Sequence, residues 1–340
     1  MSPTDDTSLP DGSELPPPTA PEVIPVSLQG FAETDLAERF GHLIANTVRH
    51  ISRVMDLERL DGITVAFDYD DALAQLDRGY AASRPLTRTS DDRLAGVAMA
   101  PAVLRGGIPK AHLVFHAPYV LPLEEDGTDA FHQALYLVAH ECGHVADLKC
   151  RDQAFPGTIL RKAILDTETA ILGVIADAVW EEYAASRASA TFGRDQAAAY
   201  DDGLASVLAA ARSEAKAAIR AYRLHGDVDR VLEEAGRPLC EPLRLAAYLL
   251  GHLDGLGGDP GLAPRARDLL AGSGYLPVVN RLHDVLRDLW SRRARWSSPA
   301  EFEPIRDMGR EVLAGGGLLL RRLPDGGVYV EVPFTPETMP

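Results

Sequence analysis

One short segment constrains the fold more than any other part of the chain. Two histidines, His140 and His144, are four residues apart, and Glu141 directly follows the first of them. Leucines and valines flank these residues on both sides, which predicts a largely buried helix. A spacing of four places both imidazoles on one face of that helix, where they can bind one zinc ion. The alternative is that both histidines only satisfy hydrogen bonds inside the core.

The glutamate between the histidines has a different predicted role. Glu141 borders the metal position and can take a proton from a water molecule that the metal activates. Two histidines and a glutamate in a buried helix need such a reason to be there, because burying polar groups without partners is costly. We therefore treat Glu141 as the candidate catalytic residue.

A catalytic zinc ion takes three protein ligands and keeps one position open, so a third ligand is expected. One known arrangement places it six residues after the second histidine, at Cys150, with a turn-forming glycine where this chain has Asp147. Asp147 does not supply that turn, and we reject this arrangement. The other arrangement takes a carboxylate from the following helix, and its candidates are Glu168, Asp177, Glu181 and Glu182.

Helical spacing favours Glu182 among these four. It shares one face with Ile171, Ile175 and Ala178, whereas Glu181 faces a more polar direction. A lone carboxylate on an apolar stripe is costly unless a positive charge neutralises it, and a zinc ion held by two histidines would do so. The expected ligands of Zn²⁺ are therefore His140, His144 and Glu182.

At this point the chain resembles the gluzincin metallopeptidases, in particular the small bacterial soluble zincins called minigluzincins, with the ImmA/IrrE-type peptidases similar in layout. The resemblance rests on His140-Glu-Cys-Gly-His144 and on Glu182-Tyr-Ala-Ala-Ser186, and it covers roughly residues 60–195. It implies a zincin-like fold in which residues 111–117 form the edge strand along the cleft and bind an extended peptide. Ser186 departs from the pattern, because several gluzincins have an aspartate there that orients a zinc-binding histidine.

The rest of the chain predicts an α+β architecture. A helix is expected over about residues 30–61, a strand over 63–69, a short helix over 70–78, and a β-hairpin from two runs at 96–104 and 111–117. Helices at about 129–150 and 158–191 carry the candidate site, and the segment to about 313 reads as helical. A second hairpin turns at Asp325-Gly326.

These elements predict four parts of the chain. Residues 1–26 read as a disordered, acidic, proline-rich leader, because the first 25 residues hold seven prolines, five acidic residues and no basic ones. The zincin-like domain is expected over 27–197, an α-helical domain over 198–315 and the β-hairpin tail over 316–340. No internal repeat of solenoid period is present.

Composition excludes several classes of protein. The 340 residues are 46% hydrophobic and 25% charged, and no apolar run is long enough to span a membrane. The formal charge of −16 would repel phosphate backbones, so neither nucleic acid nor a membrane is an expected partner. A basic run with two tryptophans, residues 281–296, reads as the end of a packed helix rather than a nucleic-acid patch. Three cysteines and a start without the features of a secretion signal predict a cytoplasmic protein.

Together these features predict an enzyme that hydrolyses a peptide bond in a peptide or protein substrate, with water activated by zinc and Glu141. The peptide substrate is implied by the resemblance alone. The alternative is a non-catalytic regulator or scaffold, stabilised by a structural zinc ion, that binds a protein partner through its helical domain. An intact Glu141 favours the enzyme, because a structural site has no use for a base there.

Overall fold

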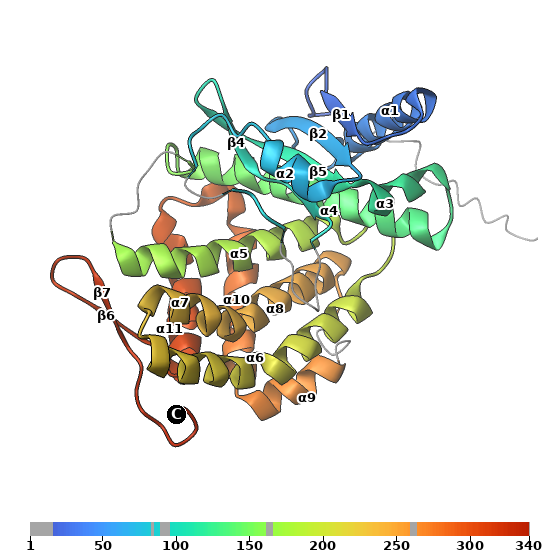
Figure 1. Cartoon of the computed structure of the whole chain (residues 1–340). Coiled ribbons are helices and arrows are strands. Elements are labelled where there is room, and N and C mark those ends of the chain that lie inside the picture. The colour runs from blue at the N-terminus through green and yellow to red at the C-terminus, as the bar shows by residue number, and fades with distance from the viewer. Residues whose placement is uncertain (1–15, 83–84, 89–95, 161–165, 259–263, 340) are drawn as a thin grey trace, which may run out of the picture.

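A small mixed sheet occupies the N-terminal part of the chain, and the C-terminal part is almost entirely helical, so the protein has an α+β fold (Figure 1). The computed structural model describes residues 16–82, 85–88, 96–160, 166–258 and 264–339. The strands are β1 (Val26–Gln29), β2 (Leu60–Ala66), β3 (Ala98–Met99), β4 (Ala102–Arg105), β5 (Ile108–His116), β6 (Leu319–Arg322) and β7 (Val328–Glu331). The helices are α1 (Thr34–Ile51), α2 (Tyr69–Gln75), α3 (Ala117–Val120), α4 (Asp129–Ala154), α5 (Thr167–Ser189), α6 (Ala197–His225), α7 (Val228–Glu234), α8 (Gly236–Leu256), α9 (Pro264–Ser273), α10 (Leu276–Ser291) and α11 (Glu303–Gly315).

Strand β5 lies inside the sheet. It pairs in parallel with β2 on one side, where Thr64 faces Val114, and it pairs antiparallel with both β3 and β4. Its core residues are fully buried, as expected for a strand covered on both faces. The prediction that residues 111–117 form the edge strand is therefore wrong. Within the described residues the outer strands are β1 on one side and β3 and β4 on the other.

The predicted hairpin is present, but its first strand is divided. The run expected as one strand over 96–104 forms β3 and β4, which are separated by Pro101. Proline has no amide hydrogen to donate to a strand ladder, so a break at this position is expected. The tight turn to β5 uses Gly106 and Gly107, both with positive φ, which glycine adopts without steric cost.

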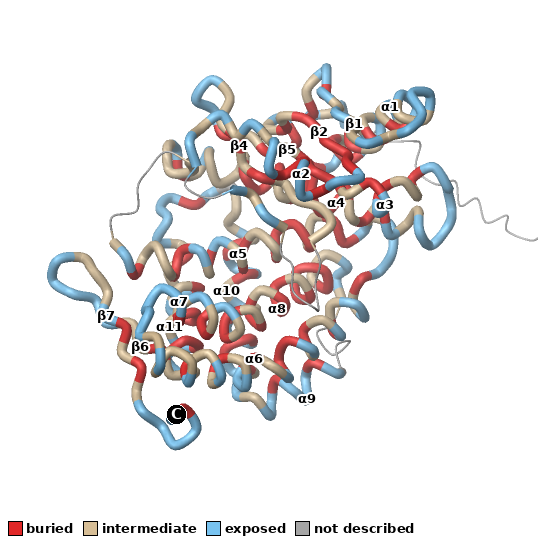
Figure 2. The backbone as a smooth tube through the Cα atoms, viewed as in Figure 1, coloured by how far each residue is buried: buried red, intermediate tan, exposed pale blue. Residues whose placement is uncertain are grey.

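Two large hydrophobic cores divide the described chain between α4 and α5, and a third, smaller cluster forms where α2 packs on β2 and β5. The first core joins the sheet, α1 and α4, and its buried members run from Ala20 to Leu148. The second joins α5 to the later helices and the C-terminal hairpin, from Phe155 to Val332. Figure 2 shows many buried residues along β2, β5, α4 and α8. Along the sequence, the change from the first core to the second therefore lies about 45 residues before residue 197, where the sequence analysis placed the end of the zincin-like domain.

The expected disordered leader is only partly outside the described residues. Residues 1–15 lie outside them, whereas the segment from Pro16 packs on the end of α1. The Thr19 hydroxyl donates to the carbonyls of Ser52 and Met55 at 2.7 and 2.8 Å, and Ala20 and Ile24 are buried. These contacts fix the segment that leads into β1, so the prediction of disorder is wrong for Pro16 to Val26.

Both helices that carry the candidate site begin at a side-chain cap. Thr128 accepts a hydrogen bond from the amide of Phe131 at the start of α4, and Asp166 accepts one from Thr169 at the start of α5. Helix α5 begins later than the predicted residue 158, and residues 161–165 are outside the described part. The C-terminal hairpin forms as predicted, with Gly326 at positive φ in its turn. In the described residues, no helix is both long and apolar enough to cross a membrane.

Candidate metal centre

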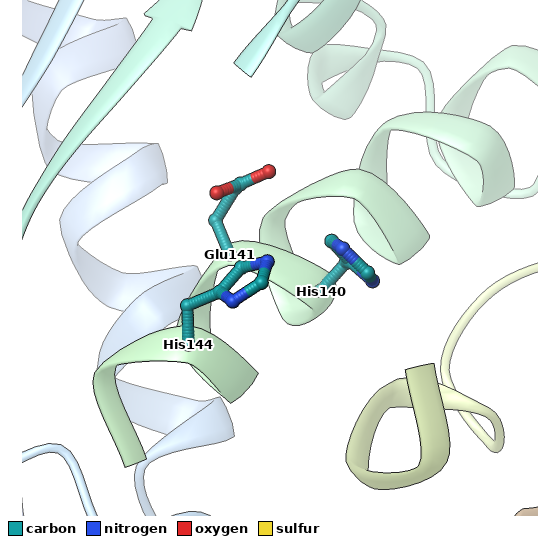
Figure 3. Close-up of side chains that lie close together, drawn as sticks. All are labelled: His140, Glu141 and His144. Atoms are coloured by element: carbon teal, nitrogen blue, oxygen red, sulfur yellow. The ribbon is translucent and has the colours of Figure 1, made fainter. Parts of the chain in front are cut away.

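The side chains of His140, Glu141 and His144 lie close together on helix α4. Figure 3 shows the three side chains leaving adjacent turns of the helix and lying close together. Each offers a nitrogen or carboxylate oxygen, and these atoms lie within 4.8 Å of one another. His140 and Glu141 are buried, whereas the side chain of His144 is 19% exposed. His144 is therefore the most exposed of the three side chains.

Helix α5 brings Glu182 to both histidines. One carboxylate oxygen, Oε2, lies 3.3 Å from Nε2 of His140 and 3.5 Å from Nε2 of His144. The side chain of Glu182 is 13% exposed. Two imidazole nitrogens from one helix thus face a single carboxylate oxygen from the next, at the junction of the two cores.

These groups alter one another's protonation. Burial raises the pKa of Glu182, but hydrogen bonds from His140 and His144 outweigh it and hold that pKa well below the usual range. Burial alone would lower the pKa of His144, yet the hydrogen bond and charge of Glu182 raise it to about 9. The imidazole of His144 and the carboxylate of Glu182 thus favour each other's charged forms.

Glu141 has the opposite environment. Its burial raises the pKa of the carboxyl group, and the nearby His144 and His140 only partly oppose this. A carboxylate that receives a proton more readily than usual suits a general base acting near neutral pH.

Helix α8 adds two residues that the sequence analysis missed. Arg244 places Nη1 3.2 Å from Oε1 of Glu182, and the ring of Tyr248 stacks on His140 with centroids 5.4 Å apart and planes 15° apart. Arg244 is a cation in the middle of a largely apolar helix, just as Glu182 is a carboxylate on an apolar stripe. Each of these two charges needs a partner of opposite sign inside an apolar helix surface. That complementarity is the sequence signal that could have predicted the contact of Arg244 with Glu182.

The position where several gluzincins have an aspartate holds a buried serine. Ser186 is fully buried, and its hydroxyl lies beside those of Tyr136 and Tyr200. Nδ1 of His140 is buried and has no hydrogen-bond partner among the described residues. The outer nitrogen of this histidine is therefore not oriented by a carboxylate from the described chain.

The other carboxylates considered as third ligands point elsewhere. Glu181 and Asp177 both pair with Arg151, and Glu168 pairs with Arg310 at 2.8 Å. None of these three contacts the histidines in the described structure, as helical spacing predicted for Glu181.

The cysteines and the basic run over residues 281–296 both lie in structural surroundings. Cys142 and Cys240 are buried free thiols, and burial raises the pKa of both. In the basic run, Arg281, Arg292 and Arg293 each pair with a carboxylate, and Trp296 packs against the aromatic rings of the second core.

No known family model, curated protein or solved structure matches this chain. Any assignment of activity therefore depends on the residues of the site itself.

Proposed function

We propose that the protein is a zinc-dependent metallopeptidase of the gluzincin type, with a zincin-like arrangement of its two site helices. In this proposal His140, His144 and Glu182 hold the metal, and Glu141 is the general base. The observation that carries it is that two Nε2 atoms on α4 face one oxygen of Glu182 on α5, at 3.3 and 3.5 Å.

The donor set fits a zinc ion. Imidazole nitrogens and a carboxylate oxygen are ordinary zinc ligands, and α4 offers its two at the required spacing. His140 turns Nε2 toward Oε2 of Glu182, on the side where the metal would bind. Three protein ligands favour a catalytic zinc ion, because structural sites usually close with four.

A zinc ion held there would act as a Lewis acid and make a water molecule more acidic. Glu141 lies beside the histidines, where its carboxylate can accept the proton of the attacking water. The same carboxyl group can then donate that proton to the leaving amine, which balances the hydrolysis of an amide bond. The peptide substrate itself rests on the resemblance to gluzincins.

The test compares the parent protein with Glu141→Gln and His140→Ala. We expect about one zinc ion per chain in the parent and in Glu141→Gln, measured by metal analysis. Cleavage of a quenched fluorescent peptide library should fall by roughly 10²- to 10⁴-fold in Glu141→Gln, while its thermal melt changes little.

Two results would count against the proposal. A Glu141→Gln variant that keeps zinc and cleaves as fast as the parent would exclude the proposed base. If Glu141→Gln changes no activity and His140→Ala loosens the fold, the zinc ion is structural and the scaffold alternative holds.

A further inference from the structure

Arg244 links the helical part of the chain to the candidate metal centre. Its guanidinium lies between two carboxylates, with Nη1 3.2 Å from Oε1 of Glu182 and Nε 3.2 Å from Oε2 of Glu241, and Nη2 also contacts Glu241. The side chain is 20% exposed. A planar guanidinium held by charge-assisted hydrogen bonds on two sides has a fixed orientation.

The two oxygens of Glu182 therefore have different partners. Oε2 faces the two histidines, and Oε1 faces Arg244. A free carboxylate can bind a metal through one oxygen or through both. A hydrogen bond from an arginine to one oxygen takes up one of its lone pairs and holds it away from the metal, which favours metal binding through the other oxygen.

We propose that Arg244 is a positioning residue that holds Oε1 of Glu182 and so makes this glutamate a single-oxygen metal ligand. The inference rests on the proposed function, because it concerns how that site holds its metal. A ligand that binds through one oxygen leaves a four-coordinate metal with one open position, whereas a carboxylate that binds through both oxygens would occupy a further position.

Helix α8 supports this arrangement through a second contact. Tyr248 lies one turn after Arg244, and its ring stacks on His140 while the guanidinium sits 5.7 Å from the centroid of the same ring. Helix α8 also packs very closely on α5, because a Cβ at Gly251 would lie 2.4 Å from the carbonyl oxygen of Tyr183. The position of Arg244 relative to Glu182 is thus fixed by direct contact of the two helix backbones.

The experiment replaces zinc with Co²⁺ in the full-length protein and records its visible absorption. Four-coordinate Co²⁺ absorbs visible light more strongly than five-coordinate Co²⁺, so band intensity reports the number of ligand atoms. We expect a strong band in the parent, a clear loss of intensity in Arg244→Met, and a smaller loss in Arg244→Lys, which keeps a cation near Oε1. Arg230→Met is the control, since Arg230 is an exposed residue of α7 whose partner is Glu234.

An unchanged band in Arg244→Met would overturn the inference, because the arginine would then not limit how Glu182 binds. If that variant fails to fold by circular dichroism, Glu241→Gln decides: it loosens Arg244 without removing it, so the band should weaken, and an unchanged band overturns the inference. A parent protein that binds neither Co²⁺ nor Zn²⁺ would instead refute the proposed function. A parent that binds Co²⁺ with a weak, five-coordinate band would refute the role of Arg244 alone.

Discussion

Gly143 on helix α4 packs directly on the backbone of Ala185 on helix α5. A Cβ atom at position 143 would lie 2.7 Å from Cα of Ala185 and 3.0 Å from its carbonyl oxygen, closer than real Cβ contacts. The glycine therefore lets the two helix backbones meet just beside His144. This close approach is what brings Glu182, three residues before Ala185, within reach of both histidines.

Gly143→Ala should destabilise the protein and weaken the metal centre together. The added methyl group must push α4 and α5 apart, which typically costs about 1–3 kcal/mol of unfolding free energy. Gly173→Ala is the matched control, because a methyl group at Gly173 in α5 would meet no described atom within 4 Å, and alanine favours helices. Urea unfolding of both variants measures the difference, and equal stabilities would show that the helices can separate without cost.

Glu182→Ala should lower zinc affinity far more than Glu181→Ala. The first change removes a proposed ligand, while the second removes a partner of Arg151 that does not contact the histidines. Loss of an outer hydrogen-bond partner already costs about 10- to 100-fold in metal affinity, so loss of a ligand should cost at least as much. Competition with a zinc chelator measures both affinities. If Glu181→Ala lowered zinc affinity more than Glu182→Ala, the assignment of the Glu182 face of α5 to the metal would be wrong.

Local sequence signals predicted the elements of the fold better than their arrangement. Helical spacing located α4, and the Asp325-Gly326 turn located the C-terminal hairpin, because these features depend on neighbouring residues. Helical spacing also located α1, although the helix expected over residues 30–61 ends at Ile51 and β2 begins at Leu60. The place of β5 within the sheet depends on which distant strands pair with it. The edge position of residues 111–117 is implied by the resemblance to gluzincins and not by these residues themselves. It is wrong because β5 pairs with β2 on one side and with β3 and β4 on the other.

In the candidate site, too, the contributions within one helix could be predicted from the sequence, whereas the contacts from a distant helix could not. The spacing of His140 and His144 and the apolar stripe around Glu182 place these side chains within their own helices, and the structure brings them together. Whether they hold a metal stays a prediction. Arg244 and Tyr248 come from a helix about 60 residues beyond Glu182, and their approach depends on the packing of α8 on α5. Periodicity within one helix carries no information about such a contact.

Asp147→Asn should strongly destabilise the fold. This carboxylate, 1% exposed, accepts hydrogen bonds from Trp180 Nε1 at 3.0 Å and Arg293 Nη2 at 3.3 Å, and Arg151 Nε lies 2.9 Å away as an ion pair. It thereby connects α4 to α5 and to the segment after α10. Removing the charge leaves Arg293 without its carboxylate partner, while Arg151 keeps Glu181 and Asp177. Breaking a buried ion pair by removing one partner costs about 3–5 kcal/mol, and we expect a loss near the lower end of that range because Arg151 stays paired.

The control for Asp147 is Asp288→Asn on α10. Asp288 is 59% exposed and pairs with Arg292 four residues later, so solvent screens this pair and its loss should change stability far less than the loss of Asp147. Urea unfolding curves give both values. Similar, small losses in the two variants would show that Asp147 does not hold the helices together.

The pair formed by His112 and Asp61 should make stability depend on pH. Nδ1 of His112 lies 3.0 Å from Oδ2 of Asp61, while Arg105 donates two hydrogen bonds of 2.9 Å to the same carboxylate. Burial lowers the pKa of His112 below 6.5, despite the opposing effect of Asp61. Burial raises the pKa of Asp61, but the hydrogen bonds from Arg105 and His112 outweigh it and hold that pKa below 3.8.

Both shifts predict that the free energy of unfolding falls with acidification, in successive ranges. As pH falls through 6.5, the unfolded chain protonates His112 before the folded protein does, so stability decreases until pH passes the folded pKa. The contribution of Asp61 is present above pH 3.8 and is lost as pH falls through its lower folded pKa. His112→Gln keeps a side chain that can hydrogen-bond but removes the titration, so unfolding curves just below pH 6.5 should show a flatter slope than in the parent. His50→Gln, at an exposed position of α1, should keep the parent slope, and the same slope in all three proteins would contradict the assignment to His112.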